Sequence, residues 1–128
     1  MKLTGKAAML GLALFLALAT ASLAVNQGFM WDGSHWKDLS TELKVAYVKG
    51  VGNMSDFEVA TGGTGRAACI SKAFVDELKT KTVAQVVQEV DTFYKDNPGT
   101  LKTSVLEVIL RRCTKLCPPE PAAAVKKQ

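Results

Sequence analysis

The chain has 128 residues, 48% of them apolar, a net charge of +4 and three cysteines. This length allows one small domain with a single modest core. Lys2 and Lys6 account for two of the positive charges, so the net charge without the N-terminal segment is about +2. This small excess removes the case for a nucleic-acid-binding protein and for one that binds a membrane surface.

The first 24 residues have the pattern of a secretory signal peptide. Two lysines precede an uncharged apolar run from residue 7 to residue 25, and small residues near its end offer two cleavage sites, after Ala19-Thr20-Ala21 or after Ser22-Leu23-Ala24. Such a run can also cross a bilayer, so an uncleaved anchor is the alternative. The run is rich in alanine and becomes more polar at its end, which is typical of a cleavage region. We therefore expect removal of residues 1–24 and a mature protein in the periplasm.

An irregular arm with three aromatic residues is expected next, over residues 26–37. Asp38 or Ser40 can cap a helix that we predict over residues 41–60. Apolar residues recur on one face of this helix at helical spacing, and we expect that face to point inward. Its members are Leu43, Ala46, Tyr47, Gly50, Met54 and Phe57. Gly50 on an inward face is expected to let another helix approach closely.

Three further helices follow. A Gly-rich loop over residues 61–65 precedes a helix over residues 67–78. Thr82 and Gln85 form a capping box for the next helix, which Asn97, Pro98 and Gly99 end. Ser104 and Glu107 form a second capping box for the last helix. Its expected inner face is Leu106, Ile109, Leu110, Cys113, Leu116 and Cys117.

The predicted fold class is all-α: a compact bundle of about four helices with an irregular N-terminal arm and one disulfide. The clearest helical stripe belongs to the third helix, with Val83, Val86, Val87, Val90, Phe93 and Tyr94. A single helical domain is predicted over residues 25–117. Residues 118–128 are rich in proline, alanine and lysine, so we expect a disordered tail.

The cysteines of an exported domain this small favour a disulfide. Cys113 and Cys117 are one helical turn apart, which makes a bond between them awkward. A bridge from Cys69 to the last helix is better placed. We favour Cys117 as the partner, because the backbone can adjust at a helix end, and Cys113 is the alternative. A redox-active centre is a weaker interpretation, since C-x3-C is not the C-x-x-C of redox enzymes.

The remaining candidates for chemistry have simpler structural interpretations. His35 is the single histidine, and its neighbour Ser34 cannot form a catalytic pair with it. Gly62, Gly63, Thr64, Gly65 and Arg66 precede a helix but lack the spacing of a phosphate-binding loop. An exposed Gly-rich loop can still bind a partner, so this segment is the candidate partner-binding site. The acidic residues are expected on solvated helix faces. The sequence therefore predicts a non-enzymatic protein without a metal site or cofactor.

Two segments resemble the Tai family of immunity proteins of type VI secretion. Residues 36–50 match a W-x-x-L-S … K-x-x-Y-V-x-G signature through Trp36, Leu39 and Ser40 and then Lys44, Tyr47, Val48 and Gly50. Residues 82–98 resemble the family's next conserved helix. The resemblance, which spans residues 29–117, also implies an upstream cysteine paired with one that closes the last helix, here Cys69 and Cys117.

This resemblance implies a periplasmic helical protein, often a homodimer, that binds a secreted peptidoglycan amidase and blocks its active site. The loop over residues 61–66 is the best candidate for the inhibitory element. A periplasmic stress chaperone is an alternative function of the binding class. A thiol redox protein or enzyme is an alternative of a different class, and it requires a reactive thiol.

Overall fold

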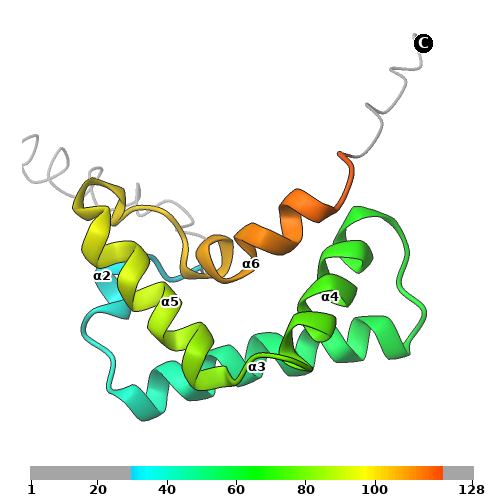
Figure 1. The fold of residues 1–128 in the computed structure, drawn as a ribbon, viewed down its shortest axis with the longest axis horizontal. Coiled ribbons are helices and arrows are strands. Elements are labelled where there is room, and N and C mark those ends of the chain that lie inside the picture. The colour runs from blue at the N-terminus through cyan, green and yellow to red at the C-terminus, as the bar shows by residue number, and fades with distance from the viewer. Residues whose placement is uncertain (1–29, 120–128) are drawn as a thin grey trace, which may run out of the picture.

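The computed structural model describes residues 30–119 and confirms the all-α fold class (Figure 1). The elements are α2 (Gly33–Trp36), α3 (Thr41–Ala60), α4 (Gly65–Leu78), α5 (Val83–Asp96), the short 3-10 helix η2 (Pro98–Thr100) and α6 (Val105–Leu116). The predicted signal peptide lies outside the described residues, as does the predicted tail beyond Pro119. Within residues 30–119, no helix is both long enough and apolar enough to span a bilayer.

The four main helices form a closed ring (Figure 1). Helix α3 packs against both α4 and α5, and α6 packs against the same two helices. The core lies inside this ring and consists of Trp36, Val48, Phe74, Val86, Val87, Val90, Tyr94, Val105, Ile109 and Cys113. The valine stripe of α5 is thus confirmed as an inward face. One residue predicted for the inner face of the last helix lies on the outside. This residue is Leu116, which is 75% exposed at the C-terminal end of α6.

Side-chain caps set the starts of three helices, as the sequence predicted. Ser40 accepts a hydrogen bond from the backbone N–H of Leu43, which satisfies one of the free donors in the first turn of α3. Thr82 and Gln85 make the reciprocal bonds of a capping box at α5. Ser104 caps α6 through the N–H of Glu107, but the reciprocal bond from the Glu107 side chain that the predicted capping box requires does not form. Helix α4 begins at Gly65, two residues earlier than expected, and its N-cap Thr64 makes no such side-chain bond.

The N-terminal arm is more regular than predicted. Its helix α2 is capped by Asp32, and the arm is held to the start of α6 by main-chain bonds, because the carbonyl of Trp31 accepts from Val105 at 2.8 Å. Trp36 is only 1% exposed, and its indole N–H donates to Asp91 of α5 at 2.7 Å. The ammonium of Lys44 binds the same carboxylate oxygen at 2.8 Å. The arm therefore joins α3, α5 and α6.

Cys69 and Cys117 form the predicted disulfide, with the two sulfur atoms 2.01 Å apart. The bond joins the first half of α4 to the residue that ends α6. Cys113 is left as a free, buried thiol. The sequence left two partners open for Cys69, namely Cys113 and Cys117, and the structure has the bond to Cys117 at the helix end.

A close contact at Gly33 gives a test of this packing. A Cβ added there would be 2.5 Å from the ring carbons Cδ1 and Cε1 of Tyr94, which is itself buried. We expect Gly33→Ala to lower the free energy of unfolding by about 1–3 kcal/mol, since the core must shift to make room. Gly99→Ala is the matched control, because a Cβ at Gly99 has nothing within 4 Å. Urea unfolding of both variants measures the difference, and equal stabilities would contradict the described packing.

Candidate functional site

The predicted partner-binding segment forms the turn between α3 and α4. The backbone N–H of Gly63 donates to the carbonyl of Glu58, and that of Gly62 donates to the carbonyl of Val59. Gly62 has a positive φ of 75°, a conformation that favours glycine. These features define a Schellman motif, the common C-terminal cap of a helix. The two glycines therefore have a structural role at the end of α3.

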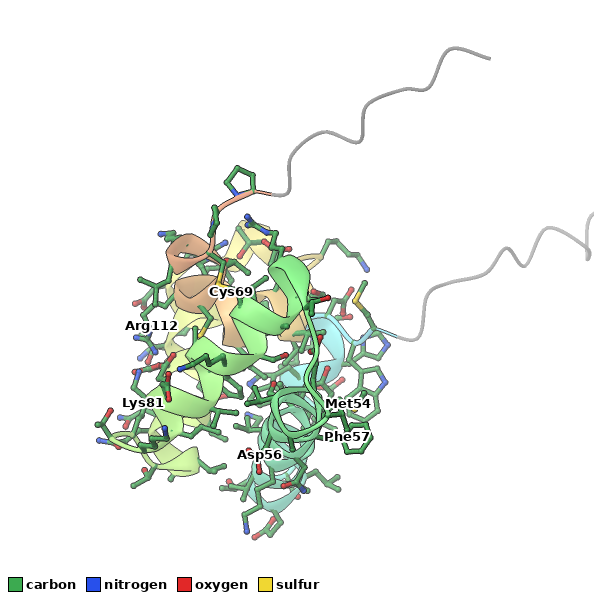
Figure 2. All side chains as sticks on the ribbon, turned by 90° about the vertical axis from the view of Figure 1, so that its right-hand side faces the viewer. Met54, Asp56, Phe57, Cys69, Lys81 and Arg112 are labelled. Atoms are coloured by element: carbon green, nitrogen blue, oxygen red, sulfur yellow. A yellow bond between two sulfur atoms is a disulfide. The ribbon has the colours of Figure 1, made fainter. Side chains whose placement is uncertain are left out.

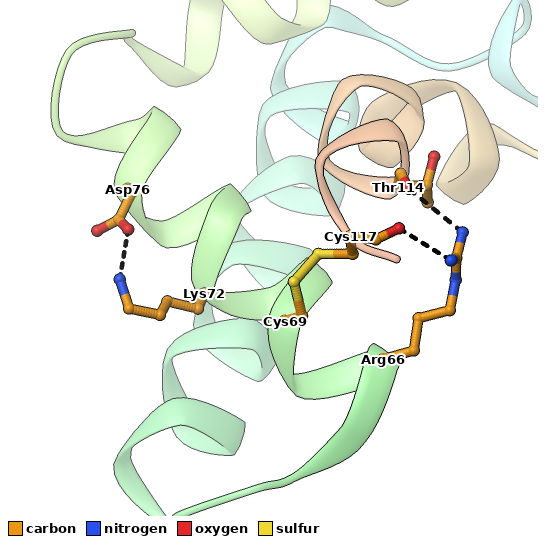
Figure 3. Close-up of a disulfide and its surroundings, with 6 residues drawn as sticks. All are labelled: Arg66, Cys69, Lys72, Asp76, Thr114 and Cys117. Carbon is orange, nitrogen blue, oxygen red and sulfur yellow. Dashed lines mark hydrogen bonds and ion pairs between the residues drawn. A yellow bond between two sulfur atoms is a disulfide. The ribbon is translucent and has the colours of Figure 1, made fainter. Parts of the chain in front are cut away.

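Arg66 connects this turn to the far end of the chain (Figure 3). Its guanidinium donates to the carbonyl of Cys117 at 2.9 Å and to that of Thr114 at 3.2 Å. These carbonyls belong to the end of α6, where helical partners are missing and a positive charge is favoured. Arg66 and Cys69 thus fasten the first turn of α4 to α6 at two points.

The remaining part of the turn is exposed. We refer to residues 61–64 as the α3–α4 loop; all four are exposed, and the loop lies at one edge of the molecule (Figure 1). Its tip consists of Gly62, Gly63 and Thr64, so it has a narrow profile with accessible backbone. The structure places the loop on braced elements at both sides. Arg66 is set apart from the other four candidate residues, because its side chain points to α6.

A second surface was not expected. Most of the face of α3 that we predicted to point inward lies on the outside: Leu43 is 56% exposed, Met54 66% and Phe57 61%. Tyr47 of that face is half-buried and packs against the core. Figure 2 shows Met54 and Phe57 projecting from the side of α3 away from Lys81 and Arg112. The buried face of α3 instead presents Val48 and Ser55 to the core. The prediction that Gly50 lies against another helix of the domain is also wrong, since a Cβ there has nothing within 4 Å.

The exposed residues of α3 border an apolar groove of about 880 Å³. Helix α3 lines it with Tyr47, Gly50, Val51 and Met54 among others, α4 contributes Ser71, and α6 contributes Leu106 and Leu110. Met30 and Trp31 of the arm also line the groove, and the Trp31 ring stacks on Tyr47 at a centroid distance of 5.5 Å. Together with Leu43 and Phe57 this is the main cluster of exposed apolar side chains in residues 30–119. Clusters of this kind mark sites of interaction.

Periodicity could not orient α3 because the helix is apolar on two faces. The stripe through Gly50 has the expected spacing, but Val45 and Val48 form another apolar stripe on a different face, with Val51 between the two. A helix that is apolar on two faces has no single face that the sequence marks as buried. The sequence feature that could have identified the buried face of α3 was this second stripe, whose β-branched residues pack against Trp36 and the rest of the core.

An ionic cluster also differs from the expectation that acidic residues are solvated. Glu77 of α4 and Glu89 of α5 each bind both Lys81 and Arg112, so four charges join three helices. Burial raises the pKa of Glu77, but hydrogen bonds from Lys81 and Cys113 and the charge of Arg112 outweigh it, so the pKa lies below its ordinary value. For Glu89, burial is similarly outweighed by Arg112 and Lys81, and its pKa is also lowered.

The free thiol does not have the properties of a reactive cysteine. Cys113 is 1% exposed, and its sulfur lies 3.4 Å from a carboxylate oxygen of Glu77. Burial, together with that carboxylate, raises the pKa of Cys113 to about 11. A thiol with this pKa is protonated at neutral pH, and the protonated form is a poor nucleophile. The site therefore does not favour the redox or thiol-enzyme alternative.

His35 has local partners. Its Nδ1 lies 2.8 Å from a carboxylate oxygen of Asp32, and its ring stacks on Trp31. The hydroxyl of Ser34 donates to the same carboxylate oxygen of Asp32. Hydrogen bonds from Ser34 and His35 hold the pKa of Asp32 well below its usual range. The three residues form the cap of α2, in agreement with a structural role for His35.

Comparisons with protein-family models, curated proteins and solved structures find no match to this chain. Within residues 30–119, no group of three His, Cys, Asp or Glu side chains is arranged to hold a metal ion. The resemblance to the Tai family therefore stays a prediction, and the α3–α4 loop and the α3 face are the candidate sites on which a function can be argued.

The ionic cluster predicts a specific dependence of stability on pH. Glu77 and Glu89 have folded-state pKa values below their ordinary value of 4.5, so their contribution is present above that pH and is lost as the pH falls through the folded values. As the pH is lowered below 4.5, we expect the urea concentration at the unfolding midpoint to decrease. This decrease should be less steep in Glu89→Gln. At pH 7 this variant should lose no more than about 1 kcal/mol, since the pairs are partly exposed.

The matched control for this experiment is Glu107→Gln. Glu107 is an exposed residue of α6 whose carboxylate lies 3.8 Å from the guanidinium of Arg111. Its substitution should leave the pH slope of the urea midpoint close to that of the wild type. If Glu89→Gln also keeps the wild-type slope, the cluster does not contribute as described.

The environment of Cys113 predicts its reactivity. In the folded protein at pH 8 we expect no reaction with an aromatic disulfide reagent, because the thiol is buried and protonated. In urea without reductant, one thiol per chain should react, since Cys69 and Cys117 remain bonded. Fast reaction of the folded protein would reopen the redox alternative.

Proposed function

We propose that this chain is an exported, non-catalytic binding protein that protects cells by binding and blocking a peptidoglycan amidase. The observation that carries the proposal is the α3–α4 loop, an exposed tip held on braced helices. The target class comes from the resemblance to the Tai family. The disulfide between Cys69 and Cys117 supports an oxidising compartment such as the periplasm.

The loop has the shape that entry into an enzyme cleft requires. Gly62 and Gly63 have no side chain and Thr64 has a small one, which keeps the tip narrow, and all three residues are exposed to solvent. An amidase that cleaves peptide stems must accommodate an extended backbone in its cleft. A loop that presents backbone groups can occupy the same space and exclude the substrate without any chemistry of its own.

The bracing of the loop favours tight binding. The Schellman motif orders its first half, and Arg66 and the disulfide fix the helix that follows. A loop already held in one conformation loses little entropy when it binds, so more of the contact energy appears as affinity. Arg66 therefore supports the loop rather than serving as a contact residue, because its guanidinium is engaged with α6.

Thr64 is the position at which contact can be tested without disturbing the fold. Its side chain is exposed and makes no capping bond. We expect Thr64→Arg to weaken amidase binding at least about tenfold, because a long charged side chain widens the tip at the centre of the contact. Calorimetry with an amidase encoded beside this gene measures the affinity, and release of peptidoglycan fragments measures inhibition.

Thr92→Arg is the matched control, since it makes the same change at an exposed position of α5 away from the loop. Its affinity for the amidase and its melting temperature should equal those of the wild type. Unchanged affinity in Thr64→Arg would move the contact to another surface. Failure of the wild-type chain to bind the amidase would reject the immunity function itself.

A further inference from the structure

The apolar groove beside α3 has an unpaired hydroxyl at its inner edge. Ser55 lines the groove where it meets the core, and the residue is only 6% exposed. Its hydroxyl makes no hydrogen bond within residues 30–119, a part of the chain in which no fully buried side-chain oxygen lacks a partner. The oxygen is therefore accessible from the groove. Because a buried hydroxyl normally has a partner, Ser55 is placed to bond a molecule that enters the groove.

A second hydroxyl comes from the facing helix. Ser71 of α4 also lines the groove and is 9% exposed, and its Oγ donates to a carboxylate oxygen of Glu58 at 2.5 Å. Glu58 follows Ser55 by three residues, about one turn further along α3. The proton of Ser71 is engaged in this bond, which leaves the oxygen free to accept another. Both serines therefore lie toward the C-terminal half of α3 and offer hydrogen bonds there.

The other end of the groove is aromatic. Tyr47 precedes Ser55 by eight residues on α3, which is about 12 Å along the helix axis, and the Trp31 ring stacks on it. Met30, Leu106 and Leu110 add further apolar surface. A ligand that matches this groove is apolar over most of its length and has one polar end.

The groove is also uncharged. None of the residues that line it carries a charge, and Glu58 lies behind Ser71 at the polar end. A charged head group would lose its hydration there without gaining an ion pair, and a carboxylate would lie near that of Glu58. An extended peptide would bury an amide at every residue, whereas the groove offers side-chain hydroxyls mainly at one end. These features exclude a fatty acid anion and an extended peptide as good ligands.

We propose that the groove binds one molecule of an uncharged lipid of the monoacylglycerol class. The acyl chain lies along α3 toward Trp31, and the ester and hydroxyl groups of the head bond Ser55 and Ser71. A volume of about 880 Å³ with a mostly apolar lining and a few polar groups is typical of small-molecule sites. Met30 and Met54 have flexible side chains that can adapt to such a chain. This inference does not depend on the amidase or on the α3–α4 loop.

Displacement of a dye tests the class of ligand. The chain expressed from its complete sequence is mixed with N-phenylnaphthylamine, an uncharged dye whose fluorescence rises in apolar surroundings. We expect monolauroylglycerol to displace the dye. Laurate has the same acyl chain with a charged head, and it should need an at least about tenfold higher concentration. Both competitors are used below the concentrations at which they form micelles.

Gly50→Leu tests the location of the ligand. A Cβ at Gly50 has nothing within 4 Å, so leucine extends into the groove without a clash. The affinity for monolauroylglycerol should fall at least about tenfold, while the melting temperature should not fall, since leucine favours a helix more than glycine does. Gly99→Leu is the matched control. It makes the same change at an open position outside the groove and should bind the ester as the wild type does.

Ser55→Ala tests the contact with the head group. The loss of one hydrogen bond between uncharged groups should weaken binding of monolauroylglycerol roughly two- to tenfold. The melting temperature should not fall, because the Ser55 hydroxyl has no partner within residues 30–119. A merely structural role for Ser55 would give the opposite pair of results.

Several results overturn the proposal. Laurate that competes as well as the ester rejects the uncharged head group, and unchanged ester affinity in Gly50→Leu places the lipid elsewhere. If the wild type binds no ester but Gly50→Leu lowers amidase affinity, the groove is a surface for the amidase. If it binds no ester and Gly50→Leu changes its sedimentation, the groove is covered by a second copy. A wild type that binds the ester but no amidase rejects only the immunity function.

Discussion

The connection between the start of α4 and the end of α6 holds the ring of helices closed. Cys69 and Cys117 form a covalent link, and Arg66 adds two hydrogen bonds to carbonyls of the last turn of α6. The link joins residues 48 positions apart, which is worth roughly 4 kcal/mol in the chain-entropy treatment. For a small domain this is a large share of the total stability. The narrow α3–α4 loop can project from the ring because the helix behind it is held in this way.

Helix α3 has two apolar faces, one buried against the core and one exposed to solvent. Val45, Val48 and Ser55 face the ring, where Val48 is fully buried, while the stripe through Gly50 faces outward. A domain of about 90 described residues can cover only part of its apolar surface, and a central helix that is apolar on both sides leaves one side uncovered. The groove beside Trp31 is the consequence. The same surplus of apolar surface that makes α3 ambiguous in sequence makes it suitable for association.

Local chemistry in the sequence was sufficient for the elements but not for their orientation. The caps at Ser40, Thr82 and Ser104 follow from short-range hydrogen bonds, so their positions could be predicted. Helix geometry favoured Cys117 as the disulfide partner of Cys69 but left Cys113 open, and the structure has the bond to Cys117. The outward face of α3 and the engagement of Arg66 with α6 depend on contacts between segments about 50 residues apart, for which single-sequence periodicity carries no signal.

The α3–α4 loop and the exposed apolar face of α3 are related through the direction of the helix. The loop follows the C-terminal end of α3, whereas the apolar face is centred near Gly50, the midpoint of the helix. Because each residue advances a helix by about 1.5 Å, the two surfaces are roughly 15 Å apart along the axis of α3. Contact through the narrow loop therefore does not require the apolar face of α3 to be covered.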